Sequence, residues 1–223
     1  MDLNKIEVPP KRKSQTGRIL LLGICLFAGV RLPAAETKTV VFFGDSLTAG
    51  YGLDPDEAFP ALIQKKIDAA GIPARVVNAG LSGETTAGGL RRLNWILRQR
   101  VDVFVIELGA NDGLRGIAPE VTRTNLQAMI DQVRMKYPTA IVVLAGMQLP
   151  TNLGQEYTHK FAAIFPDLAK SNHLTLIPFL LAGVGGVPSL NQNDGMHPTA
   201  QGDEIVADNV WKTLEPLLTD PAK

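Results

Sequence analysis

The sequence predicts an α/β protein: a three-layer α/β/α sandwich around a flavodoxin-like, five-stranded parallel sheet. Short apolar runs rich in β-branched and aromatic residues alternate along the chain with longer segments of helical periodicity. Strands that alternate with helices form a parallel sheet covered on both faces, and right-handed crossovers make that sheet doubly wound.

The individual elements are predicted from these two periodicities. The helical segments have apolar residues three and four positions apart, and Pro119 suits the first turn of one of them. No internal repeat or interdomain linker interrupts the pattern, so residues 36–223 are expected to form one domain. The predicted strands are 39–43, 75–78, 101–108, 140–145 and 174–179, and the predicted helices are 59–70, 119–137, 157–171 and 198–218.

Length and composition fit one globular domain. The chain has 223 residues, of which 45% are hydrophobic and 20% charged. Lys plus Arg and Asp plus Glu number 22 each, so no net charge attracts nucleic acid or an anionic membrane. No basic stripe is interleaved with aromatic residues, and we expect no nucleic-acid partner.

Residues 1–35 have the pattern of a secretory signal peptide: basic residues, the apolar run 19–30 and small residues up to Ala35. The run is shorter than the roughly 20 residues of a membrane span, although an uncleaved N-terminal anchor is the alternative. Cys25, the only cysteine, follows the bulky Ile24, so lipidation is not expected. Cleavage leaves a periplasmic or secreted chain without stable membrane insertion, which its core rather than disulfides must stabilise.

Four segments rich in Gly, Asn, Asp and Ser follow the predicted strands. Ligands of an open parallel sheet bind at the carboxyl ends of its strands, so these segments are expected to meet at one rim. Turn chemistry alone explains the glycines of any single loop, and their convergence is what indicates a site. The segments are 44–52, 78–83, 109–113 and 191–197.

Ser46 follows the first predicted strand directly, in Gly-Asp-Ser-Leu. A serine at a strand end is a candidate nucleophile when a base accepts its proton. We interpret the adjacent Asp45 as a local hydrogen-bonding or capping residue rather than a second base.

Of the three histidines, only His197 lies at the predicted rim. His159 falls inside a helical segment and His173 lies in a turn at the opposite rim, so structural roles are expected for both. Asp194 precedes His197 by three residues, about one turn, so its carboxylate can accept a hydrogen bond from Nδ1. Nε2 is then left to face a serine. An Asp-Gly turn before a helix explains the same residues without catalysis.

Three groups are candidate donors to an oxyanion: the backbone N–H groups of Ser46 and Gly80 and the side-chain amide of Asn111. Glycine lets the main chain approach a ligand closely, and such donors stabilise the charge of an acyl-transfer transition state. The alternative for Asn111 is a structural role in its Gly-Ala-Asn-Asp-Gly turn.

These residues resemble the four blocks of the SGNH, or GDSL, hydrolase family. Ser46, Gly80, Asn111 and His197 occur in the order of that family, in Gly-Asp-Ser-Leu, Asn-Ala-Gly, Gly-Ala-Asn-Asp and Asp-Gly-Met-His-Pro. The similarity covers nearly all of residues 37–218.

Longer segments are similar to a bacterial periplasmic subgroup described as arylesterase, acyl-CoA thioesterase I and lysophospholipase. They are 44–52, 78–85 and 107–116. That subgroup more often has a glycine at the position of Ala110, and the alanine is expected to stiffen the turn.

The resemblance implies a serine esterase or thioesterase with a triad of Ser46, His197 and Asp194, and with no metal or organic cofactor. Ser46 is expected to form an acyl-enzyme, with its oxyanion held by Ser46, Gly80 and Asn111. The expected substrate is a small acyl ester or thioester, including aryl esters and lysophospholipids, and the enzyme is expected to be a monomer.

Apolar residues in or near the rim loops are candidates for binding the acyl group, although each is also explained as a core or loop anchor. The glycine-rich segment 181–192 is expected to form a flexible wall. No inserted lid is visible, so a shallow groove of broad specificity is expected. The candidates are Leu114, Met147, Leu149, Leu181, Val184, Val187 and Leu190.

Two alternatives keep the fold and change the function. A carbohydrate or peptidoglycan O-acetylesterase requires a polar, aromatic sugar platform, and Tyr51 is the one obvious aromatic residue at the rim. A non-catalytic binding module has no need of Ser46, Asn111, Asp194 and His197 together.

Overall fold

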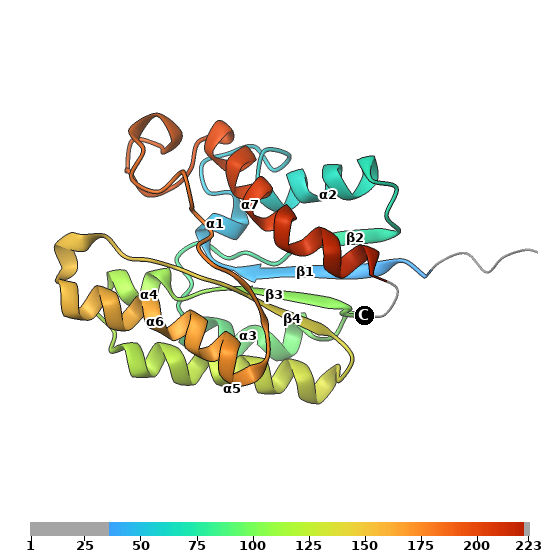
Figure 1. The fold of residues 1–223 in the computed structure, drawn as a ribbon, viewed down its shortest axis with the longest axis horizontal. Coiled ribbons are helices and arrows are strands. Elements are labelled where there is room, and N and C mark those ends of the chain that lie inside the picture. Colours follow the sequence, from blue (N-terminus) through green and yellow to red (C-terminus); the bar gives the residue numbers. More distant parts are fainter. Residues whose placement is uncertain (1–35, 221–223) are drawn as a thin grey trace, which may run out of the picture. The chain divides into compact units, whose positions relative to one another are not determined.

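A parallel sheet of five strands, in the order β2-β1-β3-β4-β5, forms the centre of the molecule (Figure 1). The computed structural model describes residues 36–220, and the predicted signal peptide, residues 1–35, lies outside the described residues. Every pair of neighbouring strands is parallel, as predicted. The strands are β1 (Lys38–Gly44), β2 (Ala74–Asn78), β3 (Val103–Glu107), β4 (Ile141–Ala145) and β5 (Thr175–Ile177).

Helices cover both faces of the sheet, which confirms the three-layer prediction. In Figure 1, α2 and α7 lie on one face and α3, α5 and α6 on the other, and the helices within each group pack against one another. None of the helices in residues 36–220 is long and apolar enough to cross a membrane. The long helices are α2 (Phe59–Ala69), α3 (Thr86–Ile96), α5 (Pro119–Lys136), α6 (Gln155–Asn172) and α7 (Ala200–Thr219).

Short helical turns follow several strands and build the rim of the sheet. They are α1 (Ser46–Ala49) after β1, α4 (Ala110–Leu114) after β3, and the 3₁₀ turns η1 (Thr151–Leu153) and η2 (Pro188–Leu190).

Helix α3 is the one long helix that the periodicity did not predict. Two consecutive glycines, Gly88 and Gly89, lower its helix propensity by about 1 kcal/mol each. Tertiary contacts compensate, because its buried Leu93 and Ile96 face the core and the hydroxyl of Thr85 accepts a hydrogen bond from the Gly88 N–H. Strands β3 and β5 are shorter than predicted, and both lie within the predicted ranges 101–108 and 174–179.

The central strands are buried and bring two of the predicted rim loops together. The side chains of Phe42, Phe43 and Phe104 are fully buried, and burying such a side chain contributes about 1.5–3 kcal/mol. Gly44 at the end of β1 pairs with Glu107 at the end of β3. The loops that follow these two strands therefore begin side by side.

Candidate active site

Ser46 is the first residue of α1, at the carboxyl end of β1. The carboxylate of Asp45 caps this short helix by accepting a hydrogen bond of 3.1 Å from the Leu47 N–H. Gly50 ends the helix in the left-handed conformation, with φ of 73°. The turn holds the Ser46 side chain partly exposed above a rigid, buried strand.

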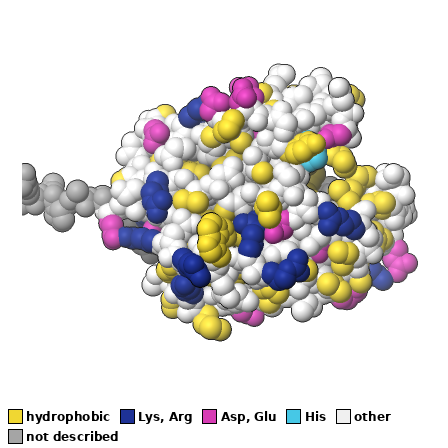
Figure 2. All heavy atoms as spheres, turned by 180° about the vertical axis from the view of Figure 1, so that it is seen from behind, with side chains coloured by type: hydrophobic (Ala, Val, Ile, Leu, Met, Phe, Trp, Pro, Cys, Tyr) yellow, Lys and Arg dark blue, Asp and Glu magenta, His cyan; other side chains and the backbone are white. Residues whose placement is uncertain are grey.

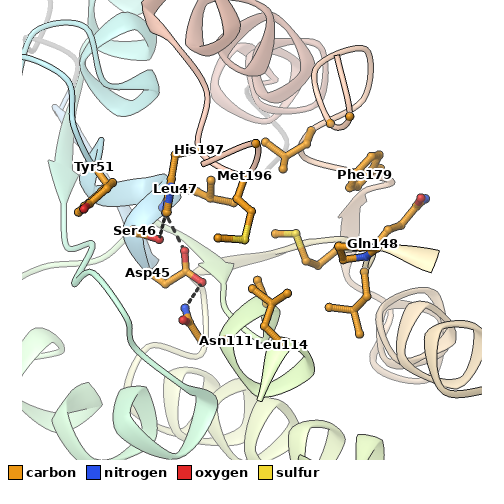
Figure 3. Close-up of a pocket in the computed structure, with 18 of the residues that line it drawn as sticks. Asp45, Ser46, Leu47, Tyr51, Asn111, Leu114, Gln148, Phe179, Met196 and His197 are labelled. Atoms are coloured by element: carbon orange, nitrogen blue, oxygen red, sulfur yellow. Dashed lines mark hydrogen bonds between the residues drawn. The ribbon is translucent and has the colours of Figure 1, made fainter. Parts of the chain in front are cut away.

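The structure brings Ser46, His197 and Asp194 into one hydrogen-bonded chain, and Figure 3 shows the contact between Ser46 and His197. Ser46 Oγ lies 2.8 Å from His197 Nε2, and His197 Nδ1 lies 2.6 Å from Asp194 Oδ2. The other carboxylate oxygen accepts the backbone N–H groups of His197 and Met196, at 3.0 and 2.9 Å. Partial burial acts to raise the pKa of Asp194, but these hydrogen bonds and the imidazole bring it down to about 2. An ionised Asp194 favours the tautomer that carries its proton on Nδ1.

The loop that carries His197 is held by Gln192. The backbone N–H of Gln192 donates to the carbonyl oxygen of His197 at 2.7 Å. Its side-chain amide donates to the carbonyl oxygens of Tyr51 and Pro198, at 2.7 and 2.8 Å. The Tyr51 ring also packs against the imidazole, with centroids 4.6 Å apart. His197 is thus fixed from its backbone and from its ring face.

Asn111 lies in α4 with its amide directed toward Asp45. Its Nδ2 donates a hydrogen bond of 2.9 Å to Asp45 Oδ2. An amide nitrogen has two N–H groups, so the second is available to a ligand. Asn111 and Ser46 line the same pocket, as predicted for a pair that acts on one acyl group.

The prediction for Gly80 is wrong. Its N–H donates to the side-chain oxygen of Asn78 at 2.9 Å, and Gly80 is not among the residues that line the pocket. A Cβ at this position would lie 2.3 Å from the backbone nitrogen of Ala49, so Gly80 is required for close packing against α1. An Asn two residues before a glycine is typical of such a turn, and this signal was present in the sequence.

Gly83 occupies the place expected for Gly80. It lines the pocket and has a φ of +78°, a backbone angle that residues other than glycine rarely adopt. Within residues 36–220 its N–H has no hydrogen-bond acceptor, whereas its carbonyl oxygen accepts a bond of 2.9 Å from Arg115. The N–H of Ser46 is likewise without an acceptor in the described chain.

Two buried carboxyl groups lie beneath Ser46. Asp45 and Glu107 are both fully buried, and Glu107 Oε2 accepts the Thr48 hydroxyl at 2.7 Å and the Asp45 N–H at 3.2 Å. Burial raises the pKa of Asp45 to about 6, against the hydrogen bonds from Leu47 and Asn111. Burial and the charge of Asp45 raise the pKa of Glu107 well above its usual range. The interpretation of Asp45 as a capping and hydrogen-bonding residue is confirmed.

A pocket of about 540 Å³ opens beside Ser46 and His197. Figure 2 shows the molecule from behind, with hydrophobic side chains and a histidine at the edge of a hollow. Phe179 and Met196 were not predicted, although Met196 is the direct neighbour of His197. The apolar lining residues include Leu114, Met147, Leu149, Phe179, Leu181 and Met196.

Three of the seven predicted pocket residues lie elsewhere: Val184, Val187 and Leu190 do not line the pocket. Val184 is fully buried in the core, Val187 is exposed and Leu190 packs against the core. The side chain of Asn191 donates to the carbonyl oxygens of Val184 and Val187, at 2.7 and 2.8 Å. These bonds curl the segment around Asn191, so that Gly185 and Gly186 line the pocket and the three predicted side chains do not.

The other histidines have no part in this arrangement. His159 is exposed on α6, and His173 caps the end of that helix in the left-handed conformation, as expected for structural residues. Over residues 36–220, no group of three or more His, Cys, Asp or Glu side chains is arranged to hold a metal ion.

Comparisons with known proteins agree with this geometry. The sequence profile of the GDSL-like Lipase/Acylhydrolase family matches residues 42–205. The chain is 43% identical to Esterase TesA of Pseudomonas aeruginosa over 202 residues, which cover 90% of this chain and 100% of that protein. It is 39% identical to Thioesterase 1/protease 1/lysophospholipase L1 of Escherichia coli K12, covering 83% of this chain and 87% of that one.

Solved structures lead to the same family. The crystal structure of TesA superposes with a TM-score of 0.78 at 43% identity, covering 81% of this chain and 100% of that chain. Fold, motif order and sequence identity therefore agree. The chain belongs to the GDSL-like lipase/acylhydrolase family, the SGNH hydrolases, and is a serine esterase/thioesterase of that family.

Proposed function

We propose that the chain hydrolyses acyl esters and thioesters through an acyl-enzyme on Ser46, with His197 as general base and Asp194 as the residue that orients it. The observation that carries this proposal is the chain of hydrogen bonds from Ser46 Oγ to His197 at 2.8 Å and on to Asp194 at 2.6 Å. These hydrogen-bonded residues adjoin an apolar pocket large enough for an acyl group. The esterase and thioesterase names of its relatives support the proposal.

The first half of the reaction forms the acyl-enzyme. His197 Nε2 removes the proton of Ser46 as Oγ attacks the acyl carbonyl carbon. The negative charge that develops on the carbonyl oxygen is held by the N–H groups of Ser46 and Gly83 and by the second N–H of Asn111. Each such donor accounts for about 100- to 1000-fold in rate. The proton on His197 then passes to the leaving alcohol or thiol.

The second half repeats these steps with water. His197 removes a proton from a water molecule that attacks the acyl-enzyme carbonyl, and then returns this proton to Ser46 Oγ as the carboxylic acid leaves. Asp194, ionised at neutral pH because its pKa is about 2, stabilises the imidazolium that exists in both halves. Both protons therefore pass through His197 Nε2, the first from Ser46 to the leaving group and the second from water to Ser46.

The lining of the pocket favours aliphatic and aryl acyl groups, as in aryl esters, acyl thioesters and lysophospholipids. Leucine, methionine and phenylalanine side chains form its walls. Tyr51, the rim aromatic residue considered for a sugar platform, packs against the His197 ring at the edge of this apolar pocket. No observation in the described chain favours the O-acetylesterase or the non-catalytic binding module.

A panel of p-nitrophenyl esters from acetate to octanoate tests this proposal. We expect turnover of the medium-chain esters by the wild-type enzyme and loss of turnover in Ser46→Ala. A serine-directed phosphonate should label Ser46. An undiminished rate in Ser46→Ala, or labelling at Ser82, contradicts the assignment, and a sharp optimum at acetate indicates an O-acetylesterase.

We also propose that the enzyme acts as a periplasmic or secreted monomer, after cleavage near Ala35. The basic, apolar and small-residue order of residues 1–35 supports export. N-terminal sequencing of the exported protein should begin near Glu36, and size-exclusion chromatography should give a monomer. A mature chain that begins at Met1 contradicts cleavage.

A further inference from the structure

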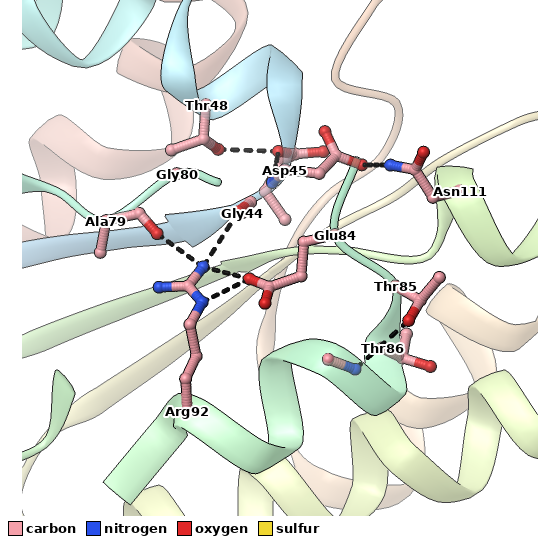
Figure 4. A network of polar contacts seen from close by, with 12 residues as sticks. Gly44, Asp45, Thr48, Ala79, Gly80, Glu84, Thr85, Thr86, Arg92 and Asn111 are labelled. Atoms are coloured by element: carbon pink, nitrogen blue, oxygen red, sulfur yellow. Dashed lines mark hydrogen bonds and ion pairs between the residues drawn. The ribbon is translucent and has the colours of Figure 1, made fainter. Parts of the chain in front are cut away.

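We propose that Arg92 is a positioning residue for the oxyanion hole, and that it holds Gly83 in register with Ser46. The inference rests on the proposed roles of Gly83 and Ser46. Residues 79–84, here called the Gly83 loop, join β2 to α3, and Arg92 projects from α3 into the space beneath this loop (Figure 4).

The guanidinium of Arg92 contacts both ends of the Gly83 loop and the end of β1. Its Nη2 donates to the carbonyl oxygen of Ala79 at 2.8 Å and to that of Gly44 at 3.3 Å. Its Nε and Nη2 face Glu84 Oε2 in a hydrogen-bonded ion pair. Ala79 begins the loop, Glu84 ends it, and Gly44 stands two residues before Ser46. One side chain therefore joins the nucleophile's strand to the two ends of the loop.

These contacts are buried and directional. The side chain of Glu84 is 4% exposed and that of Arg92 22%, so both charges are largely removed from water. The guanidinium also stacks on Phe43, 4.2 Å from the ring centroid. A buried ion pair contributes little net stability, because desolvation opposes the attraction. A planar guanidinium nevertheless fixes several acceptors in one arrangement, which a lysine does not.

The remaining contacts of the Gly83 loop are weaker anchors for its second half. The Ala79 N–H donates to the Phe42 carbonyl at 2.8 Å and the Leu81 N–H to the Gly44 carbonyl at 3.0 Å, and these bonds hold only the first half against β1. Beyond it, the Glu84 N–H donates to the Leu81 carbonyl at 3.1 Å, and the exposed Arg115 donates to the Gly83 carbonyl at 2.9 Å. Loss of Arg92 leaves Gly83 without a buried connection to the strand of Ser46.

The effect of that loss is expected in kcat. The Gly83 N–H acts on the charge of the transition state, whereas the apolar pocket binds the acyl group of the substrate in the ground state. A misplacement of about 1 Å in a reacting group costs on the order of 100-fold. A residue that only stabilises the fold changes the melting temperature and leaves the kcat of folded enzyme unchanged.

The experiment compares Arg92→Met with the double variant Glu84→Gln/Arg92→Met, which removes the unpaired buried charge. Arg91→Met is the matched control, because Arg91 is exposed on the same helix and has no ion pair in the described chain. We expect kcat for p-nitrophenyl butyrate to fall about 10- to 100-fold in both Arg92 variants, with KM within about threefold. We expect the double variant to recover melting temperature without recovering kcat, Arg92→Lys to fall between, and Arg91→Met to match the wild type.

Several results overturn the inference. One is a wild-type kcat in folded Arg92→Met. Another is a loss that appears only in KM, and a third is a kcat that recovers together with melting temperature in the double variant. Failure of the proposed function has a different signature, since an inactive wild type, or activity that survives Ser46→Ala, removes the basis of both proposals at once.

Discussion

The carboxyl groups above and below Ser46 occupy opposite environments. Asp194, on the pocket side, has a side chain that is 33% exposed and accepts three hydrogen bonds, and its pKa is about 2. Asp45 and Glu107, on the core side, are fully buried and have raised pKa values. The group with a permanent charge thus faces the histidine, and the groups that retain protons more readily support the turn from below.

This difference explains why the carboxylate next to the proposed nucleophile in sequence is not the proposed partner of His197. Asp45 is directed toward the Leu47 N–H and Asn111, and both of its oxygens are occupied. Asp194 is far away in sequence but shares a short loop with His197. Water and backbone N–H groups stabilise a charge at low cost, whereas burial disfavours it.

The largest expected effect separates the two sides directly. Asp194→Asn should lower kcat about 10⁴-fold, because an amide there favours the wrong imidazole tautomer. Asp45→Asn is the matched change on the core side. It retains one acceptor for Leu47 or Asn111, so we expect a loss below the roughly 100- to 1000-fold of a missing oxyanion donor. Steady-state kinetics with p-nitrophenyl esters measure both, and equal losses contradict the comparison.

A second, smaller effect tests the protonation of Glu107. A neutral carboxyl resembles a glutamine, so Glu107→Gln should change kcat by less than about fivefold, a loss well below that of an oxyanion donor. Glu107→Leu removes the acceptor of the Thr48 hydroxyl and the Asp45 N–H, and we expect it to lower stability by about 1–3 kcal/mol for each unpaired group. Chemical denaturation and kinetics measure these changes. A glutamine variant that loses as much kcat and stability as the leucine variant indicates that Glu107 is ionised.

The third expected effect is on stability alone, and it extends the comparison to a carboxyl group away from the active site. Asp203 in α7 accepts a hydrogen bond of 2.9 Å from the Phe59 N–H of α2. Burial raises the pKa of Asp203 to about 7, and this hydrogen bond opposes the rise. The folded state therefore holds this proton more tightly than the unfolded state, whose pKa is about 4. Its contribution to stability is present below about pH 4 and is lost as pH rises toward 7.

Asp203→Asn removes this dependence and keeps the acceptor for Phe59. The melting temperature of Asp203→Asn minus that of the wild type should increase by roughly 10 °C from pH 4 to pH 7 and then level off, since a pKa of about 7 against about 4 corresponds to about 3–4 kcal/mol and about 1 kcal/mol shifts Tm by about 2–4 °C at this size. A difference that is independent of pH shows that Asp203 titrates at its ordinary pKa.

The sequence predicted the sheet, its two covered faces and the loops that meet at its rim, because strand and helix periodicity follow directly from burial. Ser46, His197 and Asp194 could be predicted as a group because a strand end, a helix start and a three-residue spacing limit where their side chains lie. Helix α3 was not predicted, because its packing against the sheet outweighs the low propensity of Gly88 and Gly89.

The directions of side chains and backbone groups within the loops could not be predicted from the periodicity of the sequence. Gly80 and Gly83 stand three residues apart in one loop, and their roles are distinguished by the hydrogen bond from the Gly80 N–H to Asn78 and by the position of Gly83 in the pocket wall. Val184 is apolar like Leu181, yet it points into the core because the segment curls around Asn191. Such choices depend on contacts between distant segments, which a local pattern does not contain.

The order of the strands has one further consequence. The reacting groups follow β1, β2 and β3 or lie in the loop before α7, whereas much of the pocket wall follows β4 and β5, at the other edge of the sheet. Met147 and Leu149 come after β4, and Phe179 and Leu181 come after β5. Met147 and Leu149 thus lie in a connection, between β4 and α6, that carries none of the proposed reacting groups, so natural variation there can change which acyl group is accepted while the chemistry of the hydrolase is conserved.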